Sequence, residues 1–277
     1  MLSGSREAEM ARLGTMSLVV WMALLGAGRL SAQEDGSTPA PAETGSQEKE
    51  SPAPAESDSV EKEPSAPELI AKGLKWWETV ETLRATFTRR ERLADMTDLG
   101  EKQVIFLRER KNPFSIYMQW VEGPAKGRRV TYTEGKNGGK LKATPGGPMG
   151  WLTVDIVPDS AEALKYSRHT VLEAGLGRMM AGLARQFKIA APDVRSKYKG
   201  KTTYAGRPCY KFFRYMPQKP QYYCWKVELL IDEEFNYPAY LKCYDWERNA
   251  FEEYSYTDVE INPKYTDKHF DLRTGKE

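Results

Sequence analysis

The chain of 277 residues is poor in the side chains that carry most enzyme chemistry, and its only histidines are His169 and His269. A hydrolase triad needs a nucleophile, a base and an orienting acid, and neither histidine lies in a recognisable motif of that kind. Ser167, Arg168 and His169 are contiguous, and contiguous side chains rarely face one another, so a loop or surface role is favoured over catalysis. The sequence predicts a protein that is not an enzyme and has no cofactor. A hydrolase whose carboxylates lie far apart in the sequence is the third alternative.

Cysteine is equally scarce, and Cys209, Cys224 and Cys243 all fall in the last third of the chain. In an oxidising compartment two of them can pair across neighbouring strands and leave one free, and the odd number argues against a scaffold that depends on disulfides. Their spacing matches no zinc motif. The acidic run at residues 232–234 lies where a hairpin must turn, so a solvated turn is favoured over a metal site.

Long apolar runs are almost absent. The exception, residues 16–28, follows Arg6 and Arg12 and leads into small residues that end at Ala32. A run this short predicts a secretory signal peptide over residues 1–32, with an uncleaved membrane anchor as the alternative. Because no cysteine is nearby, we expect no lipid on the mature N-terminus. The predicted location is the periplasm or cell envelope.

Large apolar side chains are also nearly absent from residues 33–67, which consist mainly of Ala, Pro, Glu and Ser and are predicted to be a disordered linker. Nine carboxylates and two lysines give this linker a net charge of −7. Since the whole chain is +2 and residues 1–32 contribute +1, the predicted domain at residues 68–277 carries +8. This charge predicts an anionic partner, such as a lipid headgroup, a membrane surface or an acidic peptide, and ordinary surface lysine is the alternative. Nucleic acid is not expected for an exported protein.

Two blocks of alternating apolar and polar residues, 83–157 and 195–261, predict consecutive β-hairpins. Asn137-Gly138 predicts a type I′ turn within the first block. Many antiparallel strands in series need a large sheet that curls or packs against helices. The predicted fold class is α+β, with a single strongly curved antiparallel sheet that forms an open half-barrel and helices that cover its concave face. Strands are expected at residues 83–92, 103–110, 114–120, 128–136, 139–144, 151–157, 195–204, 207–216, 222–232, 238–246 and 251–262.

Two helices are predicted. A capping pattern at residues 65–68 starts the first, which should end near Thr82. The second has an apolar face made by Leu172, Leu176, Met179, Leu183 and Phe187. It also contains Gly175, Gly177 and Gly182, and glycine in a helix interior costs about 1 kcal/mol relative to alanine. A displaceable lid and a tightly packed contact explain these glycines equally well.

Several segments carry a family resemblance, and they span nearly the whole predicted domain. They are residues 87–92, 112–120, 127–130, 134–141, 167–169, 173–177, 230–238 and 244–246. In these segments the chain resembles an exported bacterial family of unknown function, domain-of-unknown-function family 1571. With the closing segments 256–262 and 267–270, the order of strands and helices is similar to that of periplasmic lipoprotein carriers of the LolA/LolB type. That similarity implies an open half-barrel whose hydrophobic cavity accepts acyl chains, but the carriers' functional residues do not transfer position by position.

The leading hypothesis is an exported, non-enzymatic binding protein that holds a lipid, a lipoprotein acyl chain or another apolar ligand between sheet and helices. The residues expected to line the site are Phe87, Phe106, Phe114, Ile116, Met118, Trp120, Val130, Tyr132, Leu176, Met179, Met180, Leu183, Trp225, Val227 and Leu229. The alternative is an envelope regulatory or scaffold module that binds a protein partner through a basic face. That face is predicted from Arg84, Arg89, Arg90, Arg92, Arg108, Arg110, Arg128 and Arg129.

Overall fold

The computed structural model describes residues 63–189 and 193–274. The predicted signal peptide and almost all of the predicted linker lie outside the described residues. Among those that are described, no helix is long and apolar enough to cross a membrane.

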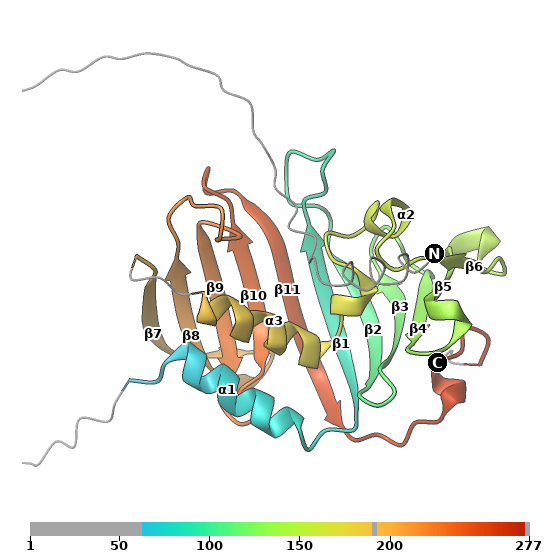
Figure 1. Cartoon of the computed structure of the whole chain (residues 1–277), viewed down its shortest axis with the longest axis horizontal. Helices are drawn as coiled ribbons and strands as arrows, with labels where there is room; N and C mark the ends of the chain where they lie inside the picture. The colour runs from blue at the N-terminus through green and yellow to red at the C-terminus, as the bar shows by residue number, and fades with distance from the viewer. Residues whose placement is uncertain (1–62, 190–192, 275–277) are drawn as a thin grey trace, which may run out of the picture. The chain divides into compact units, whose positions relative to one another are not determined.

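One antiparallel sheet of eleven strands dominates the fold (Figure 1). The strands are β1 (Thr82–Glu91), β2 (Gln103–Arg110), β3 (Ser115–Glu122), β4 (Arg129–Thr133), β5 (Leu141–Thr144), β6 (Val154–Ile156), β7 (Arg195–Tyr204), β8 (Arg207–Tyr215), β9 (Lys226–Asp232), β10 (Pro238–Tyr244) and β11 (Ala250–Ile261). Their order is β6-β5-β4-β3-β2-β1-β11-β10-β9-β8-β7, so each predicted hairpin block forms one half and the halves join where β1 pairs with β11. The edges β6 and β7 are not paired with each other, and the sheet is therefore open. The predicted fold class is confirmed.

The helices α1 (Ala66–Trp77) and α3 (Leu176–Lys188) lie side by side on one face of the sheet, which we call the inner face (Figure 1). A short helix, α2 (Ala161–Leu164), lies between β6 and α3 in the chain. Single 3-10 turns occur at η1 (Asn137–Gly139), η2 (Gly147–Met149), η3 (Val171–Glu173) and η4 (Asp267–Phe270). Both Asn137 and Gly138 have positive φ, as the predicted type I′ turn requires.

The first helix begins where it was predicted and ends earlier. The Ser65 hydroxyl accepts a hydrogen bond from the Glu68 N–H at 3.4 Å. The helix ends at Trp77 rather than near Thr82, because sheet pairing takes over the next residues: the Lys111 N–H donates to the Glu81 carbonyl. The Asn262 side chain accepts hydrogen bonds from the N–H groups of Glu81 and Thr82.

The second helix begins later than predicted, and Leu172 belongs to η3 instead. Gly175 precedes the helix with φ +99°, and a Cβ at this position would lie 2.7 Å from the Glu109 carboxylate. Gly177 lies against α1, where a Cβ would lie 2.2 Å from the Trp77 ring, whereas a Cβ on Gly182 would meet nothing closer than 3.7 Å. Close packing therefore explains two of the three glycines.

Apolar side chains form two clusters on the inner face. The first includes Leu107, Ile116 and Leu176, and the second includes Ile70 and Leu229. A third, small cluster on the opposite face joins Tyr117 to Phe270 and Leu272 of the C-terminal segment. The inner face therefore carries most of the core, and α1 and α3 close it.

In the acidic run at residues 232–234, positions 233 and 234 lie in the turn, as predicted, but Asp232 ends β9 and is fully buried rather than solvated. Its carboxylate binds both Nε and Nη2 of Arg207, at 2.6 and 3.0 Å, and accepts the backbone N–H groups of Glu234 and Phe235. No group of three metal-ligating side chains occurs in the described part of the chain. The three cysteines are buried free thiols.

Candidate binding site

Thirteen of the fifteen predicted ligand-lining residues contribute to the two inner-face clusters. They are Phe87, Phe114, Ile116, Met118, Trp120, Val130, Tyr132, Leu176, Met179, Met180, Leu183, Val227 and Leu229. Within this set, Ile116, Leu176 and Met180 are completely buried. In this conformation the side chains of α3 themselves occupy the space above the sheet.

The other two predicted residues lie apart from the set. Phe106 points to the opposite face of β2, where it packs with Tyr117 and under the Arg108 guanidinium. The reason is strand periodicity, since Ile105 and Leu107 take the inner positions on either side of Phe106. Trp225 precedes β9, and its ring packs edge-on against Tyr215 and under Arg248.

A buried carboxylate holds the start of α3. Glu109 follows Ile105 and Leu107 on the inner face of β2, and its Oε2 accepts the Leu176 N–H at 2.8 Å. Burial raises the pKa of Glu109 to about 7, although the N–H groups of Leu176 and Gly177 and the charge of Arg178 favour the carboxylate. The first turn of a helix has N–H groups without partners, and a carboxylate satisfies them. The first turn of α3 is thus attached to β2 through one titratable group.

The inner face changes from apolar to charged toward one end of β1 and β11. Along β1, Leu83, Ala85 and Phe87 are followed at the same spacing by Arg89 and Glu91. Along β11, the positions that face them carry Tyr256, Tyr254 and Glu252. Burying charges is unfavourable unless they are paired.

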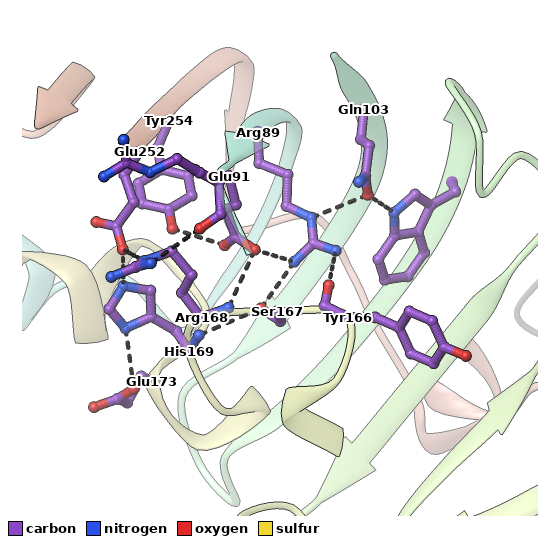
Figure 2. A network of polar contacts seen from close by, with 12 residues as sticks. Arg89, Glu91, Gln103, Tyr166, Ser167, Arg168, His169, Glu173, Glu252 and Tyr254 are labelled. Carbon is purple, nitrogen blue, oxygen red and sulfur yellow. Dashed lines mark hydrogen bonds and ion pairs between the residues drawn. The ribbon is translucent and has the colours of Figure 1, made fainter. Parts of the chain in front are cut away.

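The segment at residues 166–173 supplies partners for the β1 charges (Figure 2). Arg89 donates to the Ser167 hydroxyl and to the Tyr166 carbonyl, both at 2.9 Å, and to Gln103 at 3.1 Å. Glu91 accepts the Tyr254 hydroxyl at 2.7 Å and the backbone N–H of Arg168 at 3.2 Å.

The same segment neutralises β11. Glu252 is 2% exposed, and its Oε1 lies 2.7 Å from Arg168 Nε and 3.1 Å from His169 Nε2, and also accepts the Tyr223 hydroxyl. His169 Nδ1 lies 3.2 Å from Glu173 (Figure 2). These contacts clamp residues 166–173 over the end of the inner face.

The two carboxylates keep His169 protonated. Burial by itself would lower its pKa, but the hydrogen bonds to Glu173 and Glu252 outweigh burial and raise the pKa to about 10. Burial would raise the pKa of Glu252, yet His169, Tyr223 and Arg168 together hold it below its usual value. An imidazolium with both N–H groups engaged has no lone pair with which to accept a proton. His169 therefore forms an ionic link between Glu173 and Glu252, and its geometry does not suit a general base.

Sequence reasoning placed Ser167, Arg168 and His169 in a loop and missed their partners, which lie about 80 residues away in the chain. One signal was available. Arg89, Glu91, Glu109 and Glu252 stand at positions that strand periodicity assigns to the buried face. Charged residues at such positions require partners from another segment.

The predicted basic face is largely engaged within the fold. Arg89, Arg108 and Arg129 are less than 9% exposed. Four others form ion pairs, Arg84 with Glu260, Arg90 with Glu253, Arg92 with Asp245 and Arg110 with Asp267. Seven of the eight arginines are therefore buried or paired within the fold, and the binding of a protein partner through this face stays a prediction.

The chain belongs to the family described as "Protein of unknown function (DUF1571)", whose model matches residues 80–276. No curated protein matches it in sequence. The fold is distantly similar to several solved structures. The crystal structure of MucB is 12% identical with a TM-score of 0.44, over 74% of this chain and 62% of that one.

In two further comparisons the match covers nearly the whole length of the solved structure. The lipoprotein LppX of Mycobacterium tuberculosis is 9% identical with a TM-score of 0.44, over 72% of this chain and 97% of that one. A LolA superfamily protein from Nitrosomonas europaea is 9% identical with a TM-score of 0.29, over 76% and 98%.

Proposed function

We propose that this chain is an exported, non-enzymatic binding protein that holds a lipid, a lipoprotein acyl chain or another apolar molecule between the inner face and α3. The observation that carries the proposal is the way α3 is attached. Its apolar side chains rest on a large apolar sheet face, and its first turn is held by Glu109, whose burial as a carboxylate is unfavourable above pH 7.

Displacing such a helix would expose apolar side chains of both inner-face clusters. The part around Leu229 on β9 would stay partly covered by α1, which contacts that strand. An apolar ligand that replaced the side chains of α3 would restore the burial that the displaced helix gives up, at roughly 25 cal/mol per Å² of apolar area. The clamp of residues 166–173 would stay closed, because its charges are paired independently of α3.

Native mass spectrometry of protein purified from its own host, followed by lipid extraction, tests this proposal. We expect an added mass that organic extraction removes. The variant Met180→Trp, which overfills the space under α3, should lose that mass, while the half-buried control Gly182→Ala, whose Cβ would meet nothing closer than 3.7 Å, should keep it. A Tm measurement on each variant shows whether it is folded, and a folded wild-type protein with no apolar molecule would contradict the proposal.

A second candidate function is an envelope scaffold module that binds an acidic protein. The edge strand β7 favours it, since Arg195, Lys197 and Lys199 are exposed along an open sheet edge. An open edge can accept a further strand from a partner. Crosslinking in cells should then capture a partner that is lost in Lys197→Glu/Lys199→Glu. Capture that is insensitive to these changes would contradict this candidate.

A further inference from the structure

Exposed apolar side chains are concentrated in one short part of the chain. Of the eleven large exposed hydrophobic residues in the described part, seven lie between residues 149 and 166. They are Met149, Trp151, Leu152, Val154, Val157, Leu164 and Tyr166, and the Trp151 side chain is 80% exposed. Five of them, at residues 149–157, lie in or beside the edge strand β6 at one end of the sheet, whereas Leu164 is on α2 and Tyr166 lies in the segment that contacts β1. Clustered apolar exposure of this kind marks an interaction surface.

Beside Trp151 lies a pocket of about 440 Å³. It is lined by Gln119, Arg129, Pro148 and Trp151 and by the glycines at positions 127, 147 and 150. Arg129 is 8% exposed and donates to two backbone carbonyls, those of Leu272 at 2.5 Å and Gly150 at 3.0 Å. Among the described residues no carboxylate pairs with it. A buried guanidinium without a counter-charge attracts an anion into the adjoining pocket.

The surrounding chain is basic. Residues 123–153 contain six lysines and arginines and a single carboxylate, Glu134. Lys126 and Lys140 are exposed, and neither forms an ion pair within the described part of the chain. The Lys126 backbone lies against Gly146, next to the pocket. Lys140 is close enough to Asp155 on β6 for its charge to lower the pKa of that carboxylate. Apolar residues and unpaired cations are thus found on the same end of the molecule.

We propose that this end of the sheet docks on an anionic lipid bilayer, with Met149, Trp151 and Leu152 entering the headgroup–acyl boundary and Arg129 taking a lipid phosphate in its pocket. Tryptophan favours that boundary because its ring is apolar and its N–H is polar. Lysines next to an anionic surface add attraction. An acidic peptide would match the cations but not the five exposed apolar side chains at residues 149–157. The docking surface is separate from α3, so it does not depend on a ligand held beneath that helix.

Hydrogen exchange of the full chain, measured with vesicles of phosphatidylcholine with or without phosphatidylglycerol, tests the proposal. The readout is local, at residues 146–157, because the apolar run at residues 16–28 is present in every protein compared. We expect protection there with phosphatidylglycerol vesicles and little with phosphatidylcholine alone. The variant Trp151→Ser/Leu152→Ser should lose this protection, whereas Met96→Ser, which changes another exposed apolar residue, should keep it.

The charge requirement has its own variant. Lys126→Glu/Lys140→Glu should weaken the partition onto anionic vesicles by at least about tenfold, and less at high salt. Three results would overturn the proposal. These are no protection with anionic vesicles, equal protection with neutral vesicles, and protection that grows with protein concentration without vesicles, which would indicate a contact between two copies. Native mass spectrometry reports separately on the ligand under α3.

Discussion

At the scale of single residues, Glu109 is the group that couples the fold to pH. Its pKa is about 7 in the folded chain and about 4.5 as a free side chain. Between these values the folded chain holds a proton that the unfolded chain has released, so stability falls as pH rises from about 4.5 to 7. The pKa difference corresponds to a loss of about 3 kcal/mol.

We therefore expect Glu109→Gln to be relatively more stable at high pH. Its amide oxygen can still accept the Leu176 N–H, and it carries no charge to desolvate. Urea unfolding at pH 5 and pH 8 should show that the stability difference between variant and wild type shifts by about 2–3 kcal/mol in favour of the variant. An unchanged difference would show that Glu109 is not desolvated in the folded chain.

His169 should lose its proton at a much higher pH than an ordinary histidine does. Because its folded pKa is raised to about 10, its contribution to stability is complete below about pH 6.5 and is lost as pH rises through about 10. In NMR titrations its imidazole should remain protonated to pH 8, with His169→Gln identifying the resonance. Removing the buried partner in Glu252→Gln should move the midpoint down. A wild-type titration midpoint near 6.5 would contradict the ion pairs of His169 with Glu173 and Glu252.

At the scale of elements, the contact between α1 and α3 sets how firmly the inner face is closed. Gly177 lets the α3 backbone approach the Trp77 ring, and a methyl group there would clash. We expect Gly177→Ala to destabilise the fold by about 1–3 kcal/mol through overpacking. Gly182→Ala is the matched control on the same helix and should stabilise it by about 0.5–1 kcal/mol, because its Cβ would meet nothing closer than the Arg185 side chain at 3.7 Å, an ordinary contact. Equal effects in the two variants, measured by urea denaturation, would contradict this packing.

Strand positions were predictable from the sequence because alternation is a local signal. The strand at residues 103–110 has the predicted bounds, and β7 does too. The start of α3 was mispredicted, because Leu172 continues the apolar period, whereas Gly175 with φ +99° separates η3 from the helix beside Glu109. The hydrogen bonds between Arg168 and Glu252 could not be predicted from local patterns. Their partners come together only when β1 has paired with β11.

At the scale of the whole molecule, the two proposed surfaces lie on different parts of one sheet. The inner face under α1 and α3 is apolar and closed, and the end near β6 is apolar and exposed. A protein that docks on a bilayer through β6 and opens beneath α3 would bring a hydrophobic compartment close to lipids. Each half of this description has its own measurement.

The central claim is that an apolar molecule occupies the space between the inner face and α3. Native mass spectrometry of the protein from its own host tests it most directly. The account predicts an extractable apolar adduct on the wild type and on Gly182→Ala, and its loss from folded Met180→Trp. A folded wild-type protein that carries no such adduct, or an adduct that Met180→Trp retains in full, would contradict it.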